Sequence, residues 1–321
     1  MADRPVPVPS ARRKAILDVD PGHDDAVAIL LAAASPALEL LAITAVAGNQ
    51  TLEKTALNAR RVCSVAGIRG VPVAAGCDRP LVRPLRTAGN IHGETGLDGP
   101  VFAGEPEVPL DPRHAVDLIV ELVLAHPGEV TLIPVGPLTN LATALRREPR
   151  LAGALAGISL MGGAWGLGNQ TPGAEFNILV DPEAARVVFE SGVPIAFHPL
   201  ELTHQAKATP DVIARIEALG TPLARFVVEM LGFFAETYRQ RNGFDGPPLH
   251  DPCAVAYVID PSLFETRAVR VDVETHAEFS AGRTVVDLYG VLGEPPNATV
   301  ATAIDAPRFW DLLVGALASY R

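Results

Sequence analysis

The sequence predicts a single α/β domain in which a mainly parallel central sheet has helices on both faces. Three observations support this prediction. Short apolar runs that end at Gly, Pro or Asn alternate along the chain with longer helix-like runs. No internal repeat, low-complexity tract or obvious linker divides the 321 residues into two domains. Hydrophobic residues make up 48% and charged residues 20%, which excludes disorder as the overall state.

The first half of the chain begins with the clearest strand-to-helix pattern. Residues 14–20 form a short apolar run that ends at Pro21 and Gly22, which predicts a buried strand and a turn. A helix is predicted at 24–34, because acidic residues suit the first turn of a helix. The same reasoning predicts strands at 38–46, 71–75 and 130–135, helices at 51–66, 115–125 and 138–147, and a long loop at 76–110.

The second half continues the alternation and ends in mixed elements. The predicted elements are a strand at 158–161 before Gly162 and Gly163, a helix at 182–191, a strand at 193–197, a mostly helical region at 211–240, strand-like runs at 268–273 and 284–289, and a last helix at 309–319. Residues 1–13 alternate Pro with small residues, which predicts a disordered lead-in to one folded domain spanning 14–321.

Charge and cysteine content narrow the class of partner and compartment. Lys and Arg number 26 against 37 Asp and Glu, a net charge of −11 that argues against nucleic acid or an anionic membrane as partner. The three cysteines, Cys63, Cys77 and Cys253, form no C-x-x-C pair, so a disulfide framework or a cysteine zinc site is not expected. A reducing cytoplasm fits this content. The N-terminus shows no apolar core of signal-peptide length, and the longest apolar runs, such as 26–34, are too short to span a bilayer.

A cluster of aspartates is the strongest local signal. Asp18, Asp20, Asp24 and Asp25 lie within eight positions around one strand-to-helix junction. Carboxylates so close repel one another, and a hard divalent cation with oxygen ligands relieves that repulsion. One alternative is helix capping by Asp24 on a solvated surface. Another is a Mg²⁺ phosphoryl-transfer enzyme with an aspartyl nucleophile, which also uses a D-x-D pattern after a strand.

Two further strand ends carry groups that suit the same site. Asn49 follows the strand at 38–46, where an amide can bind a hydroxyl or water, although Gly-Asn is also a common turn. Gly136 and Pro137 force a sharp exit from the strand at 130–135. That exit can leave the carbonyl of Val135 pointing out of the sheet as a hard-cation ligand, or it can be a plain turn.

Two later segments add amide, acid and imidazole groups. The loop 169–177 holds two Asn residues and Glu175, which suits the hydroxyls of a sugar, with a solvated loop as the alternative. His250 and Asp251 stand next to each other just before a predicted helix. His250 is expected to titrate near neutrality and can supply an acid or a hydrogen-bond donor, and Asp251 can supply a metal carboxylate. His92 in the long loop is a second candidate imidazole.

Taken together, these segments resemble the inosine-uridine-preferring nucleoside hydrolase family over residues 14–320. The motifs stand in the family's order and as a set are specific. They are Ile16–Ala26 with its D-x-D-P-G-H-D-D core, Gly48–Thr51, His92–Glu94, Gly136–Asn140, Met161–Gly163, Ala174–Asn177 with Asp181–Ala185, and His250–Cys253. The resemblance implies the nucleoside hydrolase fold, which is Rossmann-like, in a catalytic domain spanning 14–321.

The resemblance also implies an N-ribosyl hydrolase that uses Ca²⁺. By family likeness Asp20, Asp25, Asp251 and the Val135 carbonyl would ligate the ion. Asp20 would act as general base on a water that the ion holds, and His250 would assist departure of the base. This chemistry is reasonable, because cleaving an N-glycosidic bond creates an oxocarbenium-like centre that nearby carboxylates stabilise.

Family likeness assigns five other residues to the ribose. Asp24 and Asn177 would bind the lower hydroxyls. Asn169 and Glu175 would bind the 5′ hydroxyl, and Asn49 would line the ribose site. The partner is thus a small nucleoside, and the resemblance further suggests a homodimer or homotetramer, a cytoplasmic location and a part in purine or pyrimidine salvage.

Residues near the leaving base are less firmly assigned. His92 is a candidate substrate-binding imidazole, and Tyr238 falls 12 positions before His250, where it could stack on the base or simply pack as a helix-face aromatic. His23 stands where relatives carry an apolar residue or His, and it is interpreted as an exposed turn residue without a role. Val135 replaces a residue that often carries a hydroxyl, but only its backbone oxygen is needed.

Two other functions are compatible with parts of the sequence. A non-catalytic nucleoside or sugar binder on the same fold would keep the ribose residues but show no turnover. A Mg²⁺ phosphohydrolase built on Asp18 and Asp20 would need a Lys and a Ser or Thr at strand ends, and the loops singled out above contain no suitable Lys.

Overall fold

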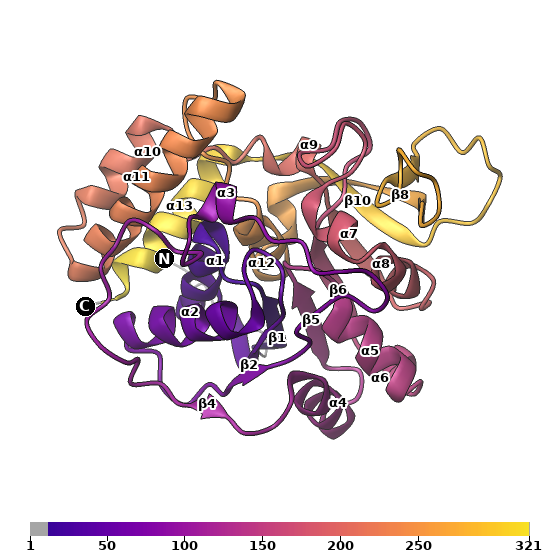
Figure 1. The fold of residues 1–321 in the computed structure, drawn as a ribbon, viewed down its shortest axis with the longest axis horizontal. Coiled ribbons are helices and arrows are strands. Elements are labelled where there is room, and N and C mark those ends of the chain that lie inside the picture. The colour runs from indigo at the N-terminus through magenta and orange to yellow at the C-terminus, as the bar shows by residue number, and fades with distance from the viewer. Residues whose placement is uncertain (1–11, 321) are drawn as a thin grey trace, which may run out of the picture.

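One twisted sheet crosses the middle of the molecule. In the computed structural model, which describes residues 12–320, ten strands follow the order β4-β3-β2-β1-β5-β6-β7-β10-β8-β9 (Figure 1). The strands are β1 (Arg13–Val19), β2 (Leu38–Ala45), β3 (Val73–Ala75), β4 (Leu110–Asp111), β5 (Val130–Pro134), β6 (Gly157–Met161), β7 (Ile195–His198), β8 (Phe264–Val273), β9 (Thr284–Asp287) and β10 (Ala298–Ile304).

Thirteen α-helices and one 3₁₀-helix connect these strands in the same described residues. They are α1 (His23–Ala34), α2 (Leu52–Val65), α3 (Gly89–His92), α4 (Ala115–Ala125), α5 (Thr139–Arg147), α6 (Leu151–Ala154), α7 (Phe176–Val180), α8 (Pro182–Phe189), α9 (Leu200–Thr203), α10 (Pro210–Glu217), α11 (Pro222–Asn242), α12 (Asp251–Ile259), η1 (Pro261–Leu263) and α13 (Ala306–Ala318).

The strand pairing confirms a mainly parallel sheet. Strand β1 pairs in parallel with both β2 and β5, and parallel pairing continues through β6 and β7 to β10. Among the named strands of residues 12–320, only the pairs β10–β8 and β8–β9 are antiparallel. Because parallel strands end at one edge, the residues that follow β1, β2, β5 and β6 meet there, where ligands of such sheets bind.

Helices cover both faces of the sheet, as predicted. One face of the sheet is covered by helices α1, α2, α11, α12 and α13, and the other face is covered by helices α4, α5, α6 and α8 (Figure 1). Strand β1 shows the consequence, because Leu17 belongs to the first core and its neighbour Ile16 to the second, and both are fully buried.

The main difference from the predicted elements lies near the C-terminus. Strand β10 connects β7 to the β8–β9 hairpin, yet its Ala- and Thr-rich sequence gave no strong strand signal. The short helices α3, α6, α7 and α9 were also not predicted, because four or five residues show no helical periodicity. The predicted helical region 211–240 divides into α10 and α11, with Gly220 at positive φ between them.

The N-terminal prediction is only partly covered by the structure. Residues 1–11 of the predicted lead-in lie outside the described residues, whereas Arg13 already begins β1 and pairs with Leu38.

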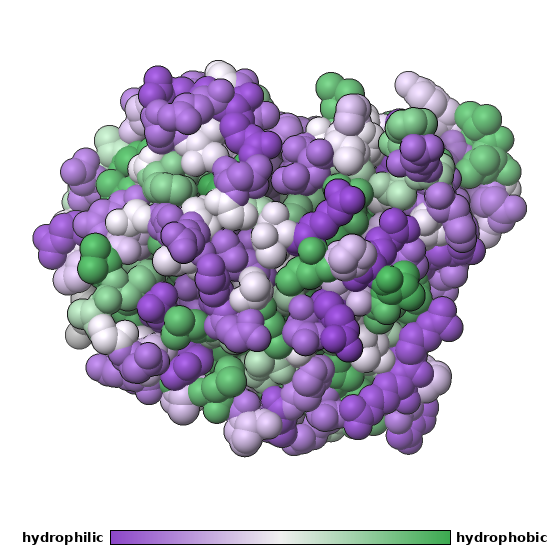
Figure 2. Space-filling view, in the orientation of Figure 1, coloured by the Kyte–Doolittle hydropathy of each residue, from purple (hydrophilic) through white to green (hydrophobic). Residues whose placement is uncertain are grey.

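No helix within residues 12–320 combines the length and apolar character needed to cross a bilayer. On the face shown in Figure 2, hydrophobic residues are scattered among hydrophilic ones.

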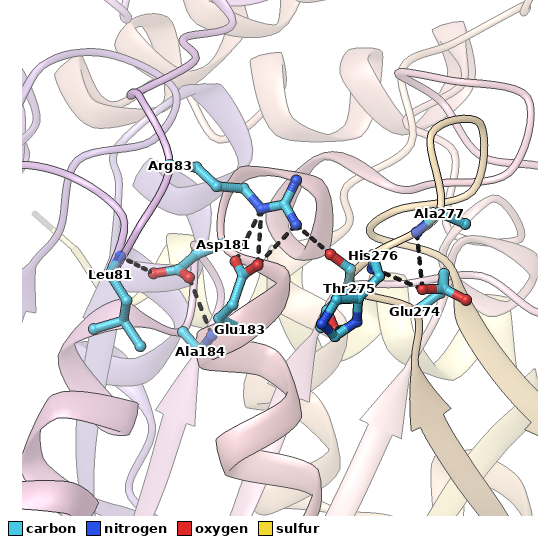
Figure 3. Close-up of polar contacts among 9 residues, drawn as sticks. All are labelled: Leu81, Arg83, Asp181, Glu183, Ala184, Glu274, Thr275, His276 and Ala277. Atoms are coloured by element: carbon cyan, nitrogen blue, oxygen red, sulfur yellow. Dashed lines mark hydrogen bonds and ion pairs between the residues drawn. The ribbon is translucent and has the colours of Figure 1, made fainter.

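An ion pair and backbone hydrogen bonds join the long loop 76–110 to the start of helix α8 and to the segment after β8. Arg83 donates to both carboxylate oxygens of Glu183 and, through Nη2 at 2.5 Å, to the carbonyl of Thr275 (Figure 3). The amide of Leu81 donates at 2.9 Å to Asp181, which also caps α8 through Ala184. The loop that carries His92 is therefore fixed to α8 and to the segment after β8.

Candidate active site

Four buried aspartates meet at the carboxyl edge of the sheet. Asp20 directly follows β1, Asp24 and Asp25 lie in the first turn of α1, and Asp251 is the first residue of α12. Their exposed fractions are 0%, 5%, 0% and 3%. None of them forms an ion pair with a Lys or Arg among residues 12–320. The predicted convergence of carboxylates is therefore present, and it includes a residue more than 220 positions away in sequence.

Hydrogen bonds fix both carboxylate oxygens of Asp25 but only one of the two carboxylate oxygens of Asp20. Asp25 Oδ1 accepts from the amide of Asp20 at 2.9 Å, and Oδ2 accepts from the amide of Gly22 at 2.9 Å and from Asn49 Nδ2 at 3.2 Å. Asn49 also donates its backbone N–H to Asp20 Oδ2 at 2.7 Å. Asp20 Oδ1 is buried without any hydrogen-bond partner in the described residues. Asn49 thus orients the acids, and one carboxylate oxygen is left free.

Two glycines allow the backbone to approach Asp20 closely. A Cβ at Gly48 would lie 2.1 Å from Asp20 Oδ2, and one at Gly136 would lie 2.4 Å from Asp20 Oδ1. Either contact is far inside van der Waals distance, so both positions exclude a side chain. The predicted Gly-containing turns therefore have a packing role at the site.

Burial makes the ionised form of these acids unfavourable. It raises the pKa of Asp24 to about 8, with the charge of Asp25 as the second cause. Burial and the neighbouring carboxylates also raise the pKa values of Asp20 and Asp251 well above their ordinary range. Without a cation the cluster would hold protons at neutral pH, whereas a bound cation would stabilise the ionised carboxylates.

Three of the acids lie close enough to one another to hold one metal ion. Carboxylate oxygens of Asp24, Asp25 and Asp251 all lie within 4.8 Å of one another. Oxygen ligands lie about 2.3–2.6 Å from Ca²⁺, so two ligands of one ion are at most about 5 Å apart. Family likeness assigned Asp20 to the ligands and Asp24 to the ribose; this distinction stays a prediction, and Asp20 is not in the group of three.

The Val135 carbonyl is the remaining predicted ligand. Val135 directly follows β5 and is buried, and its carbonyl accepts a hydrogen bond from Asn177 Nδ2 at 2.7 Å. Asn177 Nδ2 also lies 3.3 Å from the carbonyl of Met161. A carbonyl oxygen has a second lone pair, so Asn177 can orient Val135 without preventing it from binding an ion.

A cavity of about 320 Å³ opens above the acids. It brings together most of the predicted site residues: Asp24, Asn49, His92, Val135, Asn169, Glu175, Asn177, Tyr238, His250 and Asp251. Asp20 and Asp25 do not line it. A larger cavity, about 740 Å³, lies at the opposite edge of the sheet and contains none of the predicted residues.

The acid and amides of the loop 169–177 are largely engaged with the backbone. Glu175 caps α7 and accepts from the amides of Gly163, Asn177 and Ile178. Asn169 is exposed, and its Oδ1 accepts from the amide of Phe176 at 3.0 Å. Both residues border the cavity. Their assignment to the 5′ hydroxyl stays a prediction, and the capping role of Glu175 was not anticipated.

His250 lies in the middle of a hydrogen-bonded chain. Its Nδ1 lies 2.7 Å from Thr203 Oγ1, and its Nε2 lies 2.8 Å from the Tyr238 hydroxyl. Burial, with a smaller effect of His204, lowers the pKa of His250 well below its ordinary value. The expectation that His250 titrates near neutrality was therefore wrong, because the imidazole is enclosed. Thr203 belongs to none of the motifs described above, so its contact with His250 was not predicted.

The interpretation of His23 was also wrong. Its side chain is fully buried at the start of α1, not exposed in a turn. His23 stacks on His92 and on Phe234 of α11, at ring-centroid distances of 5.3 and 5.1 Å. Phe234 borders the cavity and contacts Tyr238 edge-on. The helical spacing of Phe234 and Tyr238 could have indicated that both lie on one face.

Three polar residues that border the cavity lie outside all of the predicted site segments. They are His204, Arg241 and Asn242, the last two at the exposed end of α11. Nothing in their sequence surroundings marked them. Arg241 and Asn242 reach the cavity because α11 lies beside it, and His204 reaches it from the end of α9.

Comparison with known proteins gives matches over nearly the whole chain. A family model described as inosine-uridine preferring nucleoside hydrolase matches residues 15–311. The chain is similar to an inosine-uridine preferring nucleoside hydrolase from Crithidia fasciculata, with 48% identity over 95% of this chain and 97% of that protein. It is equally similar to the pyrimidine-specific ribonucleoside hydrolase RihB of Escherichia coli, with 48% identity over 96% and 98% of the two chains.

Solved structures agree with this result. A purine-preferring ribonucleoside hydrolase from Gardnerella vaginalis superimposes with a TM-score of 0.89 at 31% identity, covering 95% of this chain and 98% of that one. The three relatives are described with three different base preferences. The similarity therefore extends to the hydrolases as a group and does not single out one base.

Proposed function

This chain belongs to the inosine-uridine preferring nucleoside hydrolase family and is a ribonucleoside N-ribohydrolase; from this premise we propose that Ca²⁺, Asp20 and His250 support the reaction. One observation supports the proposal most strongly. Buried carboxylates without cationic partners lie beneath a cavity of about 320 Å³, and one of their oxygens, Asp20 Oδ1, has no hydrogen-bond partner among the described residues.

The donor set favours a hard dication such as Ca²⁺. Asp20, Asp25, Asp251 and the Val135 carbonyl would hold it, with oxygen atoms throughout. Asp24 lies within the same short distances and is the alternative to Asp20. When bound, the ion supplies Lewis acidity and offsets the repulsion between the carboxylates.

Asp20 is the proposed general base. Water adds to C1′ of the ribose as the N-glycosidic bond breaks, and the water's proton passes to Asp20 Oδ1. Asn49 holds the other oxygen of Asp20, so the free oxygen is the one available to take the proton. Asp24 and Asn177, which border the cavity, place negative charge and an amide oxygen near the ribose as positive charge develops.

Tyr238 is the proposed donor to the leaving base, with His250 behind it. A neutral imidazole has one N–H, and Thr203 can donate to its Nδ1. His250 Nε2–H then donates to the oxygen of Tyr238, which leaves the Tyr238 O–H free to point into the cavity. His250 would thus assist the leaving group through Tyr238 and without becoming charged.

Replacing Tyr238 with Phe tests this arrangement. We expect kcat for inosine and uridine to fall about a hundredfold, because the departing base loses its donor. Cleavage of p-nitrophenyl riboside should be unchanged, since p-nitrophenolate leaves without a proton. Tyr257→Phe, at the cavity on the opposite edge of the sheet, is the matched control. An equal loss on both substrates would contradict a role in leaving-group departure.

The activity itself is measured with a nucleoside panel. Inosine, guanosine, adenosine, uridine and cytidine should each be tested for released ribose, and kcat/KM compared. We expect turnover of at least one purine and one pyrimidine nucleoside. Tight binding with no turnover across the panel would favour a non-catalytic binder, and release of phosphate from a mononucleotide would favour a phosphohydrolase.

Assembly and cellular role rest on the family likeness. A homodimer or homotetramer, a cytoplasmic location and a part in nucleoside salvage are proposals. Sedimentation velocity would determine the oligomeric state.

A further inference from the structure

His23 is a buried imidazole that the proposed mechanism does not use. It has an exposed fraction of 0% and stacks against Phe233, Phe234 and His92, with interplanar angles of 10°, 11° and 20°. Its neighbour Gly22 has no room for a side chain, because a Cβ there would lie 2.4 Å from His92 Nδ1. The two imidazoles are thus packed tightly together at the wall of the cavity.

The hydrogen bonds of His23 determine which of its nitrogens carries the proton. His23 Nε2 lies 2.8 Å from the backbone carbonyl of Asp98, and a carbonyl can only accept. The proton of neutral His23 must therefore be on Nε2, which leaves Nδ1 as an acceptor. His23 Nδ1 lies 3.1 Å from His92 Nδ1, so His92 Nδ1 must be the donor.

A different proton arrangement would require a charged His23. The backbone N–H of His23 lies 3.3 Å from the same His92 Nδ1 and would need it as an acceptor. His23 would then have to donate from both ring nitrogens. The side chain of His23 has an exposed fraction of 0%, and a charged imidazole buried in this way is disfavoured. The shorter contact to Asp98 therefore decides the arrangement.

We propose that His23 is a positioning residue that holds His92 in the Nδ1–H tautomer, so that His92 Nε2 faces the cavity as a bare acceptor. His92 Nε2 has no hydrogen-bond partner within residues 12–320, and His92 borders the cavity. It takes a hydrogen bond from an N–H or O–H of the bound nucleoside. This last step rests on the proposed function, whereas the tautomer does not.

Nitrogen NMR on protein labelled with ¹⁵N-histidine, with Ca²⁺ present, tests the tautomer without any need for turnover. A bare imidazole nitrogen resonates far downfield of one that carries a proton, so the two tautomers are distinguished directly. The eight histidines are few enough to resolve, and His92→Gln identifies the signals of His92 by their loss. We expect His92 to carry its proton on Nδ1. A proton on Nε2 in the unsubstituted protein would overturn the proposal.

Two substitutions of His23 separate the hydrogen bond from packing. His23→Phe keeps a ring between Phe233 and Phe234 but removes the acceptor. The backbone N–H of residue 23 is then the remaining partner of His92 Nδ1, so His92 should change to the Nε2–H tautomer. His23→Asn loses the stacking but offers an amide oxygen near the position of Nδ1, so His92 should keep its Nδ1–H tautomer.

The kinetic readout should follow the tautomer. With His23→Phe we expect KM to rise about tenfold with little change in kcat, because a donor replaces an acceptor in the cavity. His23→Asn should restore KM. Unchanged His92 signals in a folded His23→Phe protein would refute the positioning role. If that variant does not fold, the spectrum of the unsubstituted protein still decides the tautomer.

Discussion

Asp20→Asn is expected to lower kcat for every nucleoside by at least about a thousandfold, with the fold intact. The substitution removes the proposed base and leaves the size of the side chain unchanged. It should not unfold the protein, because the ionised carboxylate is itself unfavourable there: burial and Asp25 raise the pKa of Asp20 well above its usual value. Released ribose measures the rate, and circular dichroism measures the fold.

Asp18→Asn is the matched control for this experiment. Asp18 lies two residues earlier in the chain and is equally buried, but it is neither a proposed metal ligand nor the proposed base. Its Oδ1 accepts from both Thr44 and Asn140, and an Asn side-chain oxygen can accept the same two bonds. We expect turnover close to that of the unsubstituted protein. A folded Asp20→Asn protein that turns over as fast as this control would remove Asp20 as the base.

Removing the cation should abolish turnover and make stability depend on pH. In the cation-free protein the pKa of Asp24 is raised to about 8, from an ordinary value of 3.8, by burial first and by Asp25 second. Between about pH 4 and pH 8 the folded protein therefore binds a proton that the unfolded chain has lost. Stability must fall as pH rises through this range and level off above about pH 8.

Calcium should reverse this dependence. The ion binds ionised carboxylates, so its stabilising effect should grow from pH 5 to pH 8. At a hundredfold excess over Kd it amounts to about 2.7 kcal/mol. Thermal melts with chelator and with added Ca²⁺ at several pH values measure the difference, and nucleoside turnover should return with Ca²⁺. Melting temperatures of the chelated protein that do not fall between pH 5 and pH 8 would contradict the proposed cation site.

The strand-to-helix junction shows what could be predicted from sequence. Asp20, Asp24 and Asp25 lie in one short segment whose local geometry is set by a buried strand, a Pro-Gly turn and an acidic helix start. Neighbours in sequence have no freedom to lie far apart, so the pattern was sufficient to bring them together. Asn49 and Val135 followed from the same logic, since parallel strands end at a common edge.

Strand β10 and the short helices show where local pattern was insufficient. Their sequences are too short or too weakly patterned, and long-range contacts stabilise them. Thr299 of β10, for example, pairs with Ala196 of β7, and Ala298 pairs with Val269 of β8. Pairing of this kind depends on segments separated by long stretches of chain.

The sequence by itself therefore determined the α/β class and the cluster of N-terminal acids, and its family likeness named the residues that are proposed to bind a ribose. Only the tertiary structure decided how those residues are hydrogen-bonded and protonated. Packing of α12 against α1 brings Asp251 to the N-terminal acids, and α11 places Tyr238 against His250. Burial in that packing lowers the pKa of His250. The same packing places the ring of His23 within hydrogen-bond distance of His92. The physical reason is that motifs fix which groups are present, whereas burial and hydrogen-bond partners come from residues distant in sequence.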